Sequence, residues 1–171
     1  MARFLPFWGV RWVERRRARH RDGAQPIPAD ALRALTPFFP AETLDAARVA
    51  VVPRITVSPL LGLARRLGLP AVDGNRILGI TYLDTIVVPE SRSDPLPAAT
   101  LFHELVHVEQ ARQLGPRAFV ERYVQGWLEA RGSYAAIPLE RDAYELERRF
   151  RAAPAAAFDV AAEVARRLAA A

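Results

Sequence analysis

The sequence predicts an α+β fold in which a small sheet packs against a set of helices. Three observations predict this class. The chain has 171 residues, which suits one domain with a substantial core. Two runs, 48–57 and 77–88, are rich in β-branched and apolar residues, as strands are. After residue 97 the chain consists of helical patterns interrupted by glycine and proline.

The first elements are expected to be short. Residues 24–30 contain two prolines and an N-cap candidate, Asp30, so they form a boundary. A short helix is expected from Ala31, and the prolines after it limit its length. A further helical turn or two is expected at 41–47.

The two strand runs come next. Pro53 cannot donate a hydrogen bond within a sheet, so it restricts the run 48–57 to an edge or interrupts it. Residues 59–69 are expected to be helical or irregular. Asp73-Gly74-Asn75 is a turn signal before the run 77–88, which is the best candidate for a strand or hairpin.

Helices dominate the second half of the chain. A loop at 89–97, rich in proline, serine and aspartate, leads into a helix that carries the stretch LFHELVHVEQ at 101–110. Gly115-Pro116 is a usual stop signal, and the proline can equally open the next helix. Three further helices are expected, at 116–129, 139–151 and 155–170, with a break at 132–138.

The composition excludes several kinds of chemistry. The chain contains no cysteine, so any metal must be held by histidine, aspartate or glutamate, without thiolate ligands or a disulfide framework. All 24 basic residues are arginine. Mechanisms that need a lysine, such as a Schiff base or a P-loop, are therefore excluded.

The formal net charge is +5, and much of the excess lies at the N-terminus, where residues 1–23 hold seven arginines against Glu14 and Asp22. We therefore divide the chain into a basic, aromatic arm at 1–25 and a domain at 26–171. The charge run is typical of a solvated or loosely docked tail. Aromatic residues beside the arginines also suit peripheral contact with an anionic membrane surface.

The same segment bears on partners and location. No recognition motif accompanies its arginines, so specific nucleic-acid binding is not expected, although the charge would give non-specific, salt-dependent affinity. Its apolar part is too short to span a bilayer, and the charge follows the apolar run instead of preceding it as in a signal peptide. The expected location is cytoplasmic, with peripheral contact to a membrane.

The stretch LFHELVHVEQ holds two of the three histidines in the chain. His103 and His107 are four residues apart, so on a helix they point the same way and can share one Zn²⁺. Glu104 lies beside them, where it can reach a water molecule on the metal and act as general base. This H-E-x-x-H pattern is typical of zinc metallopeptidases. The alternative is an amphipathic helix whose histidines bond to carbonyl groups or arginines.

A catalytic zinc usually has three protein ligands and one open position. The remaining histidine, His20, lies in the basic arm, and Gln113 stands where an extended motif has its third histidine. A carboxylate from a downstream helix is therefore required. The candidates are Glu121, Glu129, Glu140, Asp142, Glu145 and Glu147.

Two motifs taken together resemble a known family. HELVHVEQ, followed by IPLERDAYELE at 137–147, is similar to small zincins of the gluzincin type. More narrowly, residues 45–150 resemble the zinc-peptidase-like domain associated with bacterial extracellular contractile injection system proteins. The resemblance implies a compact zincin-like fold, in which a small mixed sheet packs on the H-E-x-x-H helix and on a second, ligand-bearing helix, with an extra C-terminal helix. It also implies that Glu140 is the third ligand.

The sequence departs from better-known gluzincins at one position. Those proteins have, four residues after the ligand glutamate, an acidic residue that orients the first histidine, and here that position is Tyr144. Asp142 or a backbone carbonyl is then expected to orient the histidine. Tyr144, Tyr134 or Arg141 could donate a hydrogen bond to the reaction's oxyanion, and the alternative for Tyr144 is a plain core residue.

These expectations predict a zinc-dependent peptidase acting on a peptide or protein substrate. His103, His107 and Glu140 would hold Zn²⁺, and Glu104 would be the general base. By resemblance, the strand at 80–88 would bind substrate by extending the sheet edge, the alternative being an internal strand. The alternative function is a zinc-holding, non-catalytic structural or targeting module of a secretion or injection system.

Overall fold

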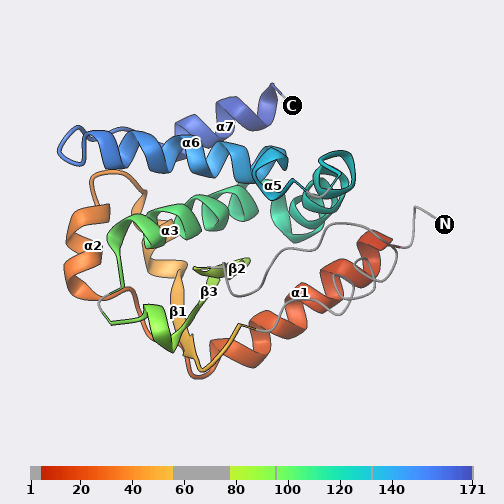
Figure 1. Ribbon diagram of the computed structural model, residues 1–171, viewed down its shortest axis with the longest axis horizontal. Coiled ribbons are helices and arrows are strands. Elements are labelled where there is room, and N and C mark those ends of the chain that lie inside the picture. The colour runs from red at the N-terminus through yellow and green to blue at the C-terminus, as the bar shows by residue number, and fades with distance from the viewer. Residues whose placement is uncertain (1–4, 56–77, 95, 132, 171) are drawn as a thin grey trace.

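The computed structural model describes residues 5–55, 78–94, 96–131 and 133–170 (Figure 1). The helices are α1 (Leu5–Arg21), α2 (Ala29–Leu35), α3 (Ala41–Ala46), α5 (Ala98–Glu129), α6 (Pro138–Ala152) and α7 (Val160–Ala169), with short 3-10 helices η2 (Glu90–Arg92) and η3 (Tyr134–Ala136). The strands are β1 (Arg48–Val52), β2 (Ile80–Tyr82) and β3 (Thr85–Pro89). The predicted α+β class, with a C-terminal helix, is confirmed.

The sheet is small and mixed, with the strand order β1-β3-β2. Parallel pairing places Val49 opposite Ile86, and antiparallel pairing places Thr81 opposite the same residue. The run 77–88 therefore contains a hairpin, and its two-residue loop has Leu83 at a positive φ of 62°. Strand β1 lies at an edge and ends before Pro53, as the proline predicts.

Side chains alternate between the two faces of the sheet along each strand, and helices pack on both faces. Ile86 and Val88 of β3 belong to the main core, together with Phe102 and Leu105 of α5. Val87 points the other way. Figure 1 shows the resulting layers, with α6 and α7 at the top, then α5, then the sheet, and α1 below it.

Helix α1 covers the second face of the sheet. Trp12 and Val13 pack with Val87 and Tyr82, and the rings of Trp12 and Tyr82 meet edge to face at 5.6 Å. The Arg17 guanidinium donates to both carboxylate oxygens of Asp84 at 2.6 and 2.7 Å. Helix α1 therefore packs on the sheet through Trp12, Val13 and Arg17, whereas its charge run suggests a solvated or loosely docked tail. Among the described helices, none is both long and apolar enough to cross a membrane.

The first half of α5 is the central element of the fold. All residues from Ala99 to Ala111 are buried. The helix is bent at Gly115, which has φ 75° and ψ 160° and precedes Pro116. This break, predicted from the Gly-Pro pair, divides α5 into a buried half that carries the H-E-x-x-H motif and a second half that reaches Glu129.

Other boundaries differ from the expectations in small ways. Helix α7 begins at Val160, later than the expected 155, because the Asp159 side chain caps it by accepting a hydrogen bond from the backbone of Ala162 at 3.0 Å. The helical or irregular segment expected at 59–69 and the turn expected at 73–75 lie outside the described residues.

The contact between α1 and the hairpin gives a testable prediction. Burial acts to raise the pKa of Asp84, but its bonds to Arg17 and the charges of Arg17 and Arg21 outweigh it and lower the pKa. Asp84→Asn is therefore expected to lower the free energy of unfolding by about 1–2 kcal/mol at neutral pH. A depressed pKa stabilises the fold above the unfolded-state value of about 4, and that stability is lost as the pH falls through the folded-state value.

Urea denaturation at pH 7 and at pH 3 tests this prediction. The difference between wild type and Asp84→Asn should be large at pH 7 and smaller at pH 3. Asp30→Asn is the matched control, because Asp30 pairs with Arg33 on the surface with 91% of its side chain exposed. An equal difference at both pH values for Asp84→Asn would contradict the assignment.

Candidate metal centre

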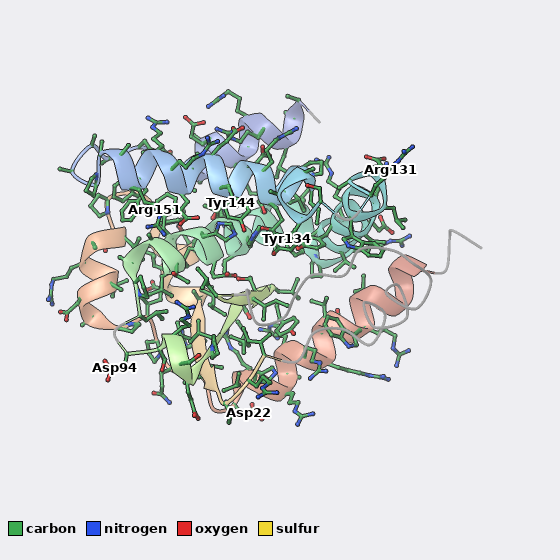
Figure 2. All side chains as sticks on the ribbon, viewed as in Figure 1. Asp22, Asp94, Arg131, Tyr134, Tyr144 and Arg151 are labelled. Atoms are coloured by element: carbon green, nitrogen blue, oxygen red, sulfur yellow. The ribbon has the colours of Figure 1, made fainter. Side chains whose placement is uncertain are left out.

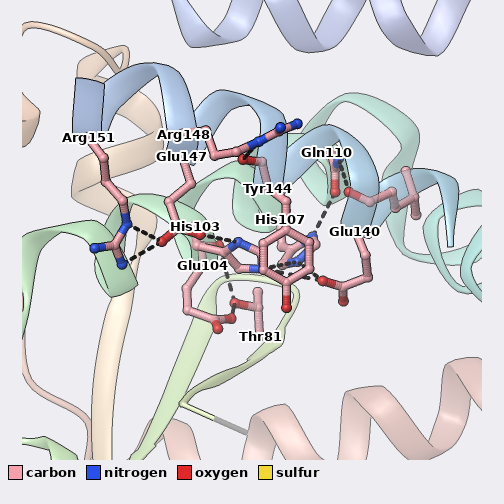
Figure 3. A network of polar contacts seen from close by, with 11 residues as sticks. Thr81, His103, Glu104, His107, Gln110, Glu140, Tyr144, Glu147, Arg148 and Arg151 are labelled. Carbon is pink, nitrogen blue, oxygen red and sulfur yellow. Dashed lines mark hydrogen bonds and ion pairs between the residues drawn. The ribbon is translucent and has the colours of Figure 1, made fainter. Parts of the chain in front are cut away.

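Three polar side chains converge between α5 and α6 (Figure 3). Nε2 of His103 and Nε2 of His107 lie 3.2 Å apart, and each lies 3.3 Å from Oε2 of Glu140. All three residues are buried, with Glu140 only 1% exposed. The two histidines share one face of α5 because they are one helical turn apart, and Glu140 faces them from the first turn of α6.

A further hydrogen bond fixes the orientation of each imidazole. Nδ1 of His103 lies 3.1 Å from Oε2 of Glu147, and a carboxylate oxygen accepts, so Nδ1 is the donor. Nδ1 of His107 lies 2.8 Å from Oε1 of Gln110, whose amide nitrogen donates to the carbonyl of Leu139. The Nδ1 atoms carry the protons, and both Nε2 atoms are left to face Glu140.

The donor set suits a divalent cation. Two neutral Nε2 atoms and a carboxylate oxygen are all electron-pair donors, and placing them together without a proton or cation between them is unfavourable. Ligands at the usual zinc distances, about 2.0–2.1 Å, lie roughly 3.3 Å apart around a tetrahedral ion. The observed separations of 3.2–3.3 Å match that spacing. The residues therefore fit a zinc ion held by two histidines and one glutamate.

The electrostatics of the cluster also favour a positive charge. Burial acts to lower the pKa of His103, but its hydrogen bonds to Glu140 and Glu147 outweigh burial and raise the pKa to about 10. Burial acts to raise the pKa of Glu140, and the neighbouring His107 and His103 lower it well below its usual range instead. Protons on the imidazoles provide positive charge beside these carboxylates, and a bound metal ion would provide it in their place.

Glu104 lies next to the three converging side chains and is 5% exposed. The hydroxyl of Thr81 on β2 donates to its Oε2 at 2.7 Å (Figure 3). Gly79 passes so close that a Cβ atom there would lie 2.8 Å from Oε1 of Glu104, so any side chain would displace the carboxylate. Burial raises the pKa of Glu104, against the opposing charges of His103 and His107. A raised pKa makes the carboxylate a stronger base for the proton of a water molecule.

Tyr144 lies against the cluster from α6. Its ring centroid is 4.6 Å from that of His103, and 38% of the residue is exposed. Burial raises the pKa of its phenol to about 12, aided by the charges of Glu140 and Glu147, so it stays a hydrogen-bond donor at neutral pH. Figure 2 shows Tyr144 near the middle of the view, between α6 and the sheet, and Figure 3 shows its ring in front of His107.

The contacts of the acidic candidates distinguish Glu140 from the others as the third ligand. Among the described residues, Glu140 is the one whose carboxylate lies with both histidines. Glu121, Glu129 and Glu145 bond instead to Arg117, Gln125 and Arg167 respectively. The expectation that Asp142 orients His103 is wrong, because Asp142 lies near Arg167 and Arg141, and Glu147 has that place.

Sequence reasoning missed three of the polar partners. Glu147 appeared only as a candidate ligand, although it lies seven residues after Glu140, a spacing that places both on one face of α6. Its carboxylate is held by Arg151 one turn further on. Thr81 and Tyr123 had no local signal, because they reach the site from other elements.

The sheet edge near the site differs from the expected strand at 80–88. Among the described strands, β3 is internal, between β1 and β2, whereas β2 lies at the edge. Any strand added to the sheet on the side of Glu104 would therefore pair with Ile80–Tyr82 alone.

Comparison with protein-family models, with curated proteins and with solved structures gave no match to this chain. The site is therefore interpreted from its own geometry.

Proposed function

We propose that this protein is a zinc-dependent peptidase, with His103, His107 and Glu140 as ligands and Glu104 as general base. One observation carries the proposal. Three buried electron-pair donors, two imidazole nitrogens and a carboxylate oxygen, lie 3.2–3.3 Å from one another. A further buried glutamate, Glu104, lies beside these three donors and is not one of the three ligands. Bound zinc would lower the pKa of a water molecule and polarise the scissile carbonyl.

The side chains have separate roles in this proposal. Glu104 accepts the proton of the attacking water at its carboxylate and passes it to the leaving amine. Thr81 holds that carboxylate in place through its hydroxyl. The phenol of Tyr144 donates to the oxygen on which negative charge develops. No covalent bond between enzyme and substrate is needed.

Catalysis is favoured over a structural zinc site for two reasons. Structural zinc sites are usually closed by four protein ligands, and the described part of the chain offers three in this cluster. A purely structural site also gains nothing from Glu104, whose burial beside other carboxylates has an energetic cost. The alternative of a zinc-holding targeting module uses the same ligands, so a turnover assay separates the two functions.

The substrate is expected to bind as an extended peptide along β2. A strand added at this edge would run past Thr81, whose hydroxyl is bonded to Glu104. Peripheral membrane contact and a cytoplasmic location stay predictions. Two of the arginines of α1, Arg17 and Arg21, pair with Asp84.

Cleavage of a broad peptide library by zinc-loaded protein tests the proposed function. Cleavage should appear with zinc, disappear with a chelator, and be lost in Glu104→Gln. Metal-loaded wild-type protein that cleaves no member of the library would favour the non-catalytic module.

A further inference from the structure

The two carboxylate oxygens of Glu140 have different surroundings. Oε2 lies 3.3 Å from Nε2 of both His103 and His107. Oε1 accepts a hydrogen bond of 2.7 Å from the hydroxyl of Tyr123. The phenol of Tyr134 also lies close to Tyr123 and Glu140, and both contribute to the raised pKa of that phenol, after burial. One oxygen therefore faces the histidines, and the other is held by the phenol of Tyr123.

The packing of α5 against α6 places Tyr123 at this position. Tyr123 belongs to the second half of α5, beyond the bend at Gly115. It packs in one cluster with Phe119 and with Leu139, the residue before Glu140. The cluster thus holds the phenol beside the first turn of α6, which carries Glu140.

We propose that Tyr123 is a positioning residue that limits Glu140 to a single ligand oxygen, Oε2. This inference rests on the proposed function, because it concerns the same metal site. Carboxylates bind metals through one oxygen or through both. A second oxygen from Glu140 would add a fifth donor to the two imidazoles, Oε2 and the bound water molecule, and would crowd the position that a catalytic zinc keeps open for water. By engaging Oε1, the Tyr123 hydroxyl disfavours that arrangement and preserves the open position.

The test compares Tyr123→Phe with Tyr82→Phe. The control makes the same chemical change on the opposite face of the sheet, where Tyr82 packs against Trp12.

Two quantities are measured: zinc affinity by competition with a chelator, and the visible absorption of the Co²⁺-loaded protein. Tyr123→Phe should bind zinc roughly 10- to 100-fold more weakly than wild type. Its cobalt absorption should also be weaker, because five-coordinate Co²⁺ absorbs less than four-coordinate Co²⁺. Tyr82→Phe should match wild type in both quantities.

Each outcome decides a separate point. An unchanged cobalt spectrum in Tyr123→Phe overturns the inference, whatever the change in zinc affinity. Wild-type protein that takes up neither zinc nor cobalt overturns the proposed function itself. If circular dichroism shows that Tyr123→Phe is unfolded, Tyr134→Phe replaces it, with a smaller spectral change in the same direction expected. An unchanged spectrum in that variant overturns the inference as well.

Discussion

Glu104→Gln is expected to lower the rate of peptide hydrolysis roughly 100- to 10,000-fold, which is the usual contribution of a general base. Glutamine has nearly the shape of glutamate, so Thr81 can still donate to the side-chain oxygen. The amide cannot accept a proton from the attacking water. Zinc content should stay at the wild-type value, because Glu104 is not one of the three converging ligands.

The measurement pairs a peptide-cleavage assay with metal analysis of the same sample. Glu121→Gln is the matched control, since Glu121 lies on the same helix and pairs with Arg117 at the surface. That control should cleave at the wild-type rate. Undiminished cleavage by Glu104→Gln would assign the proton transfer to another group.

Zinc is expected to stabilise the folded protein strongly. The cluster places two histidines and a glutamate in the interior, and the folded state alone brings them together. A ligand present at 1,000 times its dissociation constant adds about 4 kcal/mol, which for a chain of this size raises the melting temperature by about 10 °C.

Thermal unfolding with zinc and with a chelator measures this difference. The variant His107→Ala lacks one ligand, so its melting temperature should respond little to zinc. A zinc-dependent shift of equal size in wild type and in His107→Ala would mean that the ion binds elsewhere.

The fold was predictable from sequence wherever the signal is local. The hairpin follows from a β-branched run, and the bend of α5 follows from Gly115-Pro116. Helix α1 was not recognised as part of the packed structure, because its arginines dominate the pattern. The contact that explains two of them, from Arg17 and Arg21 to Asp84, joins residues more than 60 positions apart.

The residues of the site were likewise predictable from sequence only where the signal is local. His103, Glu104 and His107 follow from helical spacing, since one turn of helix places both imidazoles on one face. Glu140 was selected through a family resemblance, because spacing alone left six carboxylates open. The residues that hold these side chains were beyond local reasoning: Tyr123 is 17 positions from Glu140 in the sequence, and Glu147 is 44 from His103.

The most direct test of the proposed zinc centre is metal analysis of purified wild-type protein beside Glu140→Ala and Glu145→Ala. Both glutamates lie on α6, but Glu140 faces the histidines and Glu145 pairs with Arg167. We expect one zinc per chain in wild type and in Glu145→Ala, and none in Glu140→Ala. A wild-type protein that neither contains zinc nor takes it up, or a Glu140→Ala variant that keeps it, would contradict the assigned centre.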